Sequence, residues 1–290
     1  MRSTENVSSG PVVCGIDGSS EAATAAQVAA RIAARLDRPL ALVHVAPQPS
    51  VPERPYATRD ERLQERVQFE HAGYLHTVLE RVEVAEAPLV ARIVEWGNAD
   101  DVLRSVARGL AAELLVVGSR GQSAVEDVLI PGSTSMALAR AAPVPVVITP
   151  PATGEQGVAV PGDAVACGVD GSPLSIAAAR TAGRLAERLG VPLVLVTVDS
   201  GDAGDDAAEA SVADVAPGVD VRAERARGPV AEGLIAASAR HDAGLIAVGS
   251  RGRGALTSAV LGSVTATLLR RSDRPVLVVP RGATDPDSPE

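Results

Sequence analysis

Lysine is absent from the 290-residue sequence, so arginine supplies all 27 of its strongly basic side chains. This absence excludes a Walker A phosphate loop, a Schiff-base lysine and a lysine general base. Aromatic residues make up only 1% of the chain, which removes the stacking platforms that single-stranded nucleic acids need. Because the net charge of −9 also repels phosphate backbones and anionic lipids, we expect neither a nucleic-acid nor a membrane partner.

Cysteine and long apolar runs are also scarce. Cys14 and Cys167 each lie inside a short apolar run typical of a buried strand, which argues against a disulfide framework. No uncharged apolar run reaches the roughly 18 residues of a membrane span, and the N-terminus is polar where a secretory signal is apolar. We therefore expect a soluble cytoplasmic protein.

The four histidines lack the spacing of a zinc site. His44 lies in a predicted strand and is interpreted as a satisfied interior histidine rather than a ligand. His71 and His76 are five positions apart in a predicted helix, on different faces, so a shared metal is not expected.

What the sequence does contain is an internal repeat. The stretch 12–19 (VVCGIDGS) returns as 165–172 (VACGVDGS), and 117–121 (VGSRG) returns as 248–252. The first copy carries 22 more residues than the second between these landmarks. The repeat predicts two homologous halves.

The composition places the domain boundaries. We predict a first domain over 1–150, a linker over 151–164 that is rich in Gly and Pro, and a second domain over 165–280. The polar segment 281–290 is predicted to be a flexible tail.

Short branched-aliphatic runs alternate with alanine-rich segments of helical period. The runs of the first half suit parallel strands buried on both faces, which are mostly apolar rather than alternating, and they span 12–16, 40–45, 89–94, 114–118 and 145–149. Helices are predicted over 20–36, 58–82, 99–112, 133–142, 229–240 and 263–272. The alternation predicts an α/β fold of two tandem doubly wound sandwiches, each with a five-stranded parallel sheet.

A glycine pattern follows one predicted strand of the second half. Gly249 and Gly252 come directly after the apolar run 245–248, and nine residues separate Gly252 from Gly262 and Ser263 at a helix start. Glycines let backbone N–H groups approach anionic oxygens, and a helix start is partially positive. The alternative is an ordinary turn followed by an ordinary helix start. Without lysine, such a site is better suited to holding phosphate than to transferring it.

The pattern Gly-x2-Gly-x9-Gly-Ser, closed by the strand 275–279, resembles the ATP-binding signature of the universal stress protein family. Asp170 and the stretch 196–198 also match, and the resemblance covers about 12–150 and 165–280. It implies a Rossmann-like sheet of order 3-2-1-4-5 in each domain. It further implies an ATP-binding regulator of the stress response or of growth.

The resemblance also implies the cofactor-binding residues. In the second half these are Asp170, Val198, Gly249, Arg251, Gly252, Gly262, Ser263, Val264 and Thr265. Their counterparts in the first half are Asp17, Val45, Gly118, Arg120, Gly121, Gly132, Ser133 and Thr134. Strand order 3-2-1-4-5 would bring these residues to the crevice where the winding of the sheet reverses. Mg²⁺ would suit this site by bridging the phosphates, since it prefers oxygen ligands and keeps much of its water.

The first half departs from the signature, because ten residues rather than nine separate Gly121 from Gly132. Pro131 also removes one backbone N–H before the helix. A loop can absorb one residue, so nucleotide binding is still expected there, with weaker affinity.

Three alternatives stay open. Asp17 and Asp170 precede Gly-Ser and could cap the next helix through an Asx turn, which is compatible with ligand contact. The same pocket could serve a slow ATPase or an adenylyl-transferring enzyme, although no Gly-x-Ser-x-Gly elbow is present and no catalytic residue is assigned. A nucleotide-free interaction scaffold is the third possibility.

The closing strands, 144–148 and 275–279, would lie at sheet edges, where bare apolar strands invite pairing. We predict that the two halves pair through them as an intrachain pseudo-dimer, which could assemble further into a homodimer.

Overall fold

The computed structural model describes residues 10–46, 88–119, 134–151, 162–199, 218–252 and 261–283. The first half contains β1 (Val12–Ile16), α1 (Ser20–Arg35), β2 (Leu40–Ala46), β3 (Leu89–Trp96), α3 (Ala99–Gly109), β4 (Leu114–Gly118), α4 (Thr134–Ala141) and β5 (Val146–Thr149). The second contains β6 (Ala164–Gly168), α5 (Pro173–Leu189), β7 (Leu193–Asp199), β8 (Val221–Arg227), α7 (Val230–Arg240), β9 (Ala243–Gly249), α8 (Ser263–Arg271) and β10 (Val276–Val279). The helix predicted over 58–82 lies outside the described residues.

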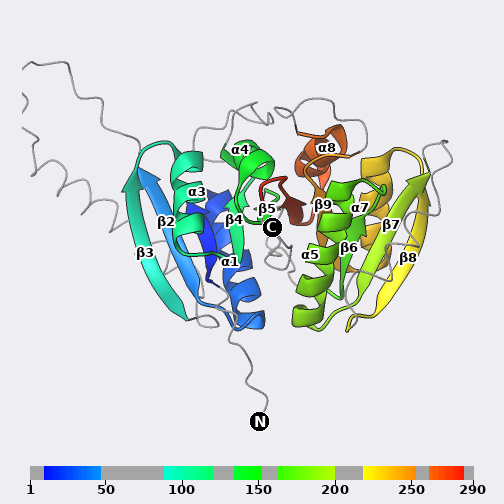
Figure 1. Ribbon diagram of the computed structural model, residues 1–290, viewed down its shortest axis with the longest axis horizontal. Coiled ribbons are helices and arrows are strands. Elements are labelled where there is room, and N and C mark those ends of the chain that lie inside the picture. The colour runs from blue at the N-terminus through cyan, green and yellow to red at the C-terminus, as the bar shows by residue number, and fades with distance from the viewer. Residues whose placement is uncertain are drawn as a thin grey trace, which may run out of the picture.

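The strands form one ten-stranded sheet of order β3-β2-β1-β4-β5-β10-β9-β6-β7-β8 (Figure 1). Within each half every pairing is parallel and the order is 3-2-1-4-5, so the predicted fold is confirmed. The halves meet through an antiparallel pairing of β5 with β10, in which Leu277 lies opposite Val147. The closing strands therefore pair within the chain, as predicted.

Serine side chains cap the N-terminal ends of α1 and α5, the first helix of each half. The Ser19 hydroxyl accepts a hydrogen bond from the Ala22 N–H at 3.1 Å, which caps α1. In α5 the Ser172 side chain caps in the same way, Pro173 occupies the first turn, and Gly190 ends the helix with a positive φ of 69°.

Two apolar cores cover the faces of the joined sheet. One lies under α1 and α5 and includes Val147 of β5 and Leu277 of β10, so it is shared by both halves. The other lies under α3, α4, α7 and α8. Among the described residues, no helix is both long and apolar enough to cross a membrane.

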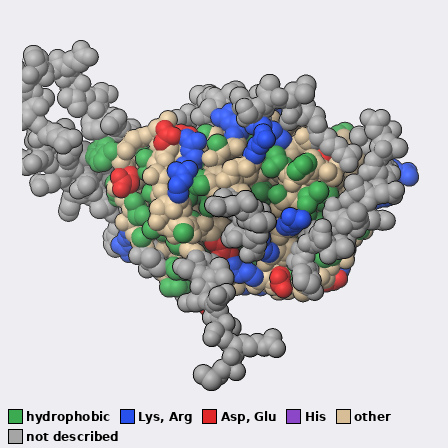
Figure 2. Space-filling model, viewed as in Figure 1, with side chains coloured by type: hydrophobic (Ala, Val, Ile, Leu, Met, Phe, Trp, Pro, Cys, Tyr) green, Lys and Arg blue, Asp and Glu red, His purple; other side chains and the backbone are tan. Residues whose placement is uncertain are grey.

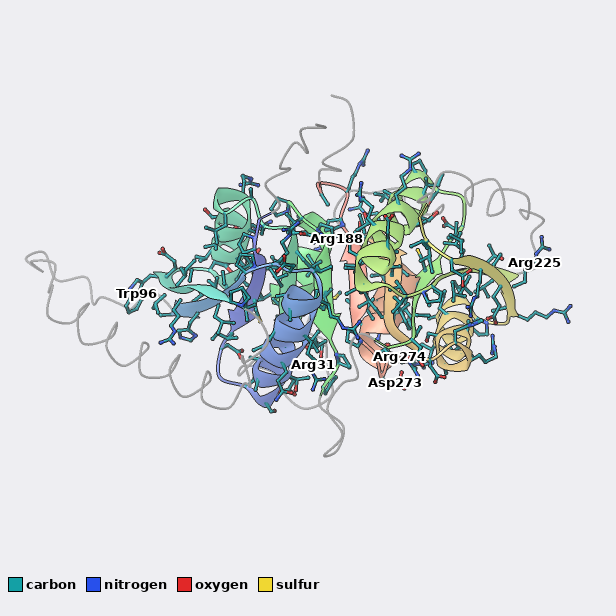
Figure 3. All side chains as sticks on the ribbon, turned by 90° about the horizontal axis from the view of Figure 1, so that it is seen from below. Arg31, Trp96, Arg188, Arg225, Asp273 and Arg274 are labelled. Carbon is teal, nitrogen blue, oxygen red and sulfur yellow. The ribbon has the colours of Figure 1, made fainter. Side chains whose placement is uncertain are left out.

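A reciprocal arginine contact joins the C-terminal ends of α1 and α5. Arg35 Nη1 donates to the Leu189 carbonyl at 3.3 Å, and Arg188 Nη2 donates to the Leu36 carbonyl at 2.8 Å. Each cation thus meets the partially negative end of the other half's helix. Figure 3 places Arg188 at the junction of the halves, where it also pairs with Glu113.

The β5–β10 register can be tested with a disulfide between Val147→Cys and Leu277→Cys. Directly opposed residues of antiparallel strands have Cα atoms about 4.5–5.5 Å apart, within reach of a disulfide. We expect an intrachain crosslink under oxidising conditions, detected by mass spectrometry of linked peptides. The native thiols should not compete, because burial raises the pKa of Cys167 to about 12 and raises that of Cys14 as well.

The matched control pairs Val146→Cys with Leu277→Cys. Val146 opposes Val278 and lies against the other core, so its side chain and that of Leu277 are on different faces of the sheet. Crosslinking of the control pair in preference to the first would contradict the register.

Candidate functional site

The candidate site of the second half lies where β6 and β9 end. These strands are parallel neighbours, and their last pairing joins Cys167 to Ala247. Asp170 and Gly249, near the ends of these two strands, therefore lie side by side. The loops that follow them lead to the N-terminal ends of α5 and α8. This is the point at which the winding of the sheet reverses, where open α/β sheets bind ligands.

Asp170 organises the turn between β6 and α5. Its Oδ1 accepts a hydrogen bond from the Ser172 N–H at 2.9 Å, so the expected Asx turn is present. Its Oδ2 faces the glycine loop, because a Cβ built on Gly252 would lie 2.5 Å from that oxygen. One carboxyl group thus holds the turn and borders the crevice. In the first half, Asp17 Oδ1 accepts from the N–H and the hydroxyl of Ser19, at 3.1 and 2.7 Å.

Gly249 is required by packing. A Cβ at this position would lie 2.8 Å from the Leu174 carbonyl oxygen and 2.9 Å from its carbon, in the first turn of α5. The backbone there has little freedom to move, so only glycine lets α5 lie against the end of β9.

Gly262 is the N-cap of α8. Gly262 has no side chain with which to cap, so the N–H groups of Ser263, Val264 and Thr265 have neither an intrahelical acceptor nor a side-chain cap. Such a helix start attracts anions. The N–H of Gly262 itself is occupied, since it donates to the Ser250 carbonyl at 2.9 Å.

Thr265 and Ser263 differ in position. Thr265 is buried and its hydroxyl donates to the Gly249 carbonyl at 3.0 Å, which ties the start of α8 to the end of β9. Ser263 is exposed at the mouth of the loop. The Thr265 hydroxyl therefore supports the loop, and the Ser263 hydroxyl is open to a ligand.

Val198 presents its backbone to the crevice. Its side chain packs on α7, since a Cβ on Gly233 would lie 3.1 Å from Val198 Cγ1. The Val196 carbonyl accepts the Val169 N–H at 3.0 Å on the β6 side. Val198 is two residues beyond Val196 on the same strand, so its N–H and C=O also point to the β6 side. The last residue of β6 that pairs with β7 is Gly168, opposite Val196, so β6 does not cover the backbone of Val198.

In the first half the structure describes the base of the corresponding loop. The Ser119 N–H donates to the Thr149 carbonyl at 2.9 Å, and the Ser135 hydroxyl donates to the Ser119 carbonyl at 3.2 Å. Of the predicted site, Asp17, Val45, Gly118 and Thr134 are described, whereas Arg120, Gly121, Gly132 and Ser133 lie outside the described residues.

His44 is an interior residue, as expected. The residue is 6% exposed, and Nδ1 lies 2.9 Å from the Ile16 carbonyl oxygen, which can only accept, so that nitrogen carries the proton. Where the chain is described, no group of three or more His, Cys, Asp or Glu residues could hold a metal. The face shown in Figure 2 intersperses arginine with acidic and apolar side chains, without a continuous basic stripe.

Two residues of the site were not predicted from the sequence. Ser119 and Ser250 follow the last residues of β4 and β9, and both hydroxyls are buried without a hydrogen-bond partner. The repeated VGSRG stretch contains both serines, but it does not indicate that their hydroxyls are buried and unpaired.

The fold and this site define a tandem α/β protein in which β4 and β9 end at Gly118 and Gly249, at the reversal point of each half-sheet. The model of the universal stress protein family matches residues 9–150 and 199–280, and the chain belongs to this family. A universal stress protein of Mycolicibacterium smegmatis is 28% identical over 310 residues, 92% of this chain and 96% of that protein. One from Mycobacterium tuberculosis is 32% identical over 306 residues, with the same coverage of 92% and 96%.

Solved structures agree on the fold. A universal stress protein of Archaeoglobus fulgidus has a TM-score of 0.72 at 20% identity, covering 95% of this chain and 100% of that one. A putative universal stress protein of Pseudomonas aeruginosa has a TM-score of 0.59 at 14% identity, covering 95% and 94%.

The packing role of Gly249 predicts that Gly249→Ala destabilises the protein by about 1–3 kcal/mol, because the added methyl overlaps backbone of α5. Thermal or denaturant unfolding measures the effect. Gly109 is the matched control, since a Cβ there meets nothing within 4 Å and alanine favours the helix. Equal stability of the two variants would contradict the proposed close approach of α5 to β9.

Proposed function

We propose that this chain binds ATP at the candidate site of the second half and, more weakly, at that of the first, and acts as a nucleotide-dependent regulator of the stress response or of growth. The observation that carries the proposal is the start of α8, where three N–H groups lack an acceptor beside a carboxylate-bordered crevice. Family membership supports the regulatory role.

The described residues divide between the two ends of the nucleotide. The backbone N–H and C=O of Val198 form a donor–acceptor pair suited to the edge of adenine, and Asp170 borders the place where ribose would lie. The phosphates would meet the amides of Ser263 and Val264, together with the Ser263 hydroxyl. Gly252 and Gly262 leave room for them, while Gly249 and Thr265 support the loop.

Charge neutralisation relies on few cations. Without lysine, the partial positive charge of the α8 start and, among the described residues of the loop, Arg251 would contribute to binding a polyanion. Mg²⁺ would fit as a companion of the phosphates, held by their oxygens and water, because the described side chains include no ready ligand cluster. Such a site suits retention of ATP more than its hydrolysis.

The proposal predicts that ATP is released when freshly purified protein is denatured, as mass spectrometry of the small molecules would show. Its absence from protein that also fails to bind added ATP would favour a nucleotide-free scaffold. Rapid multiple turnover with release of product would favour an enzyme.

We also expect Gly262→Val to abolish ATP binding in the second half while the fold is retained. A Cβ at Gly262 would already lie 3.2 Å from Arg251 Cα and 3.3 Å from the Ser250 oxygen, so valine fills the space beside the first-turn amides. Calorimetric titration measures binding, and unfolding curves verify the fold. Gly109→Ala serves as the control that keeps full binding, and undiminished ATP binding by Gly262→Val would exclude the proposed cradle.

A further inference from the structure

Ser250 and Ser119 occupy equivalent positions in the two halves, and both side chains are almost completely buried. Ser250 is 1% exposed and Ser119 is 3% exposed, and neither Oγ has a hydrogen-bond partner. A buried hydroxyl without a partner is unfavourable, so its presence calls for an explanation. Its recurrence in both halves ties it to the repeated loop.

The other buried hydroxyls of the described residues are all satisfied. Those that form a hydrogen bond are Thr24, Ser135, Thr149, Ser172, Ser175, Ser238, Thr265 and Ser272. The packing of this protein therefore readily supplies partners for serine and threonine. The two exceptions both lie at the base of the loop assigned to phosphate.

The backbone of each exception is fixed on both sides. The Ser250 N–H donates to the Val279 carbonyl at 3.0 Å, and its C=O accepts the Gly262 N–H at 2.9 Å. The Ser119 N–H donates to the Thr149 carbonyl, and the Ser119 C=O accepts the Ser135 hydroxyl. The hydroxyl can therefore change its environment only by rotation about χ1, or by the arrival of a new acceptor.

The direction of Ser250 follows from the strand. The missing Cβ of Gly249 points at Leu174 of α5, and successive side chains of a strand alternate between faces. Ser250 therefore points to the opposite face, whose apolar core includes Leu268 and Leu269 of α8. The Gly249 carbonyl accepts from Thr265 and the Ser250 carbonyl accepts from Gly262, and neither receives the Ser250 hydroxyl.

We propose that the Ser250 hydroxyl, and that of Ser119 in the first half, is a phosphate-binding donor whose acceptor is a phosphate oxygen of the bound nucleotide. This inference rests on the proposed ATP binding. An anion that binds the first-turn amides of α8 sits next to Gly262, whose N–H is bonded to Ser250 itself. The anion would thus bring an acceptor to the Ser250 hydroxyl, which has none among the described residues.

The test is the double variant Ser119→Ala with Ser250→Ala, with each single variant alongside. We expect ATP to bind about tenfold more weakly per site, the size expected for loss of a hydrogen bond to a charged acceptor. Adenosine, which has no phosphate, should bind with unchanged affinity. The melting temperature of the nucleotide-free protein should not fall, because the removed hydroxyl makes no hydrogen bond there.

Ser238→Ala is the matched control. Ser238 is fully buried like Ser250, but its hydroxyl donates to the Ile235 carbonyl at 2.7 Å, away from the site. We expect this variant to melt at a lower temperature and to bind ATP as the wild type does.

The outcomes separate the two proposals. If the wild type binds ATP and the double variant binds it equally well, the role of the serines is overturned and the proposed function stands. Equal losses of ATP and adenosine binding with a lower melting temperature would also overturn it, because they indicate a structural role. If the wild type binds no ATP, both proposals fail.

Discussion

The antiparallel pairing of β5 with β10 is the interaction on which the architecture depends. All eight residues of these strands are at most 3% exposed, so neither half could present its closing strand to water at low cost. Pairing them turns two five-stranded sheets into one and merges the apolar layers beneath α1 and α5. It also leaves β3 and β8 as the outer strands, and β8 carries Arg222, Glu224 and Arg225, charges that discourage further pairing.

Helices α1 and α5 connect the two candidate sites to this junction. Each of α1 and α5 begins at a serine cap beside Asp17 or Asp170 and ends at the arginine contact with the other half. The contact is symmetric in its helices but not in its charges. Glu113 pairs with Arg38 and Arg188, whereas the matching position of the second half is Gly244. The halves are thus equivalent in fold and different in the electrostatics of their junction.

The sequence is sufficient to predict the parts of the fold that depend on local patterns. Strands buried on both faces form short, mostly apolar runs, so the bounds of β1 and β4 were predicted to the residue. The helical period of the alanine-rich stretch after β1 likewise predicted α1. The apolar closing strands even predicted their own pairing. The arginine contacts at Leu36 and Leu189 could not be predicted, because they join residues more than 150 positions apart through packing alone.

The sequence predicted which strand ends and loops form the candidate site, but it did not predict which of their residues support the loop and which face the crevice. A glycine gives the same signal whether a ligand or a helix approaches it, and only the structure shows that α5 explains Gly249. Likewise the sequence pattern places Thr265 among the ligand-binding residues, whereas in the structure its hydroxyl donates to the Gly249 carbonyl. Buried hydroxyls without a hydrogen-bond partner, as at Ser119 and Ser250, have no sequence signature. Whether a hydroxyl finds a partner depends on all the groups that pack around it in the folded protein.

The unsatisfied groups of the site share one chemical character. The helices α1 and α5 have serine caps, whereas α8 starts with a glycine that leaves its first-turn N–H groups without a side-chain acceptor. A glycine in place of a serine cap costs a few tenths of a kcal/mol, and the unpartnered Ser250 hydroxyl adds a further cost. All these groups are hydrogen-bond donors. A protein with net negative charge does not attract a polyanion over long distances, so recognition of one would depend on short-range contacts with donors that the fold fixes in advance.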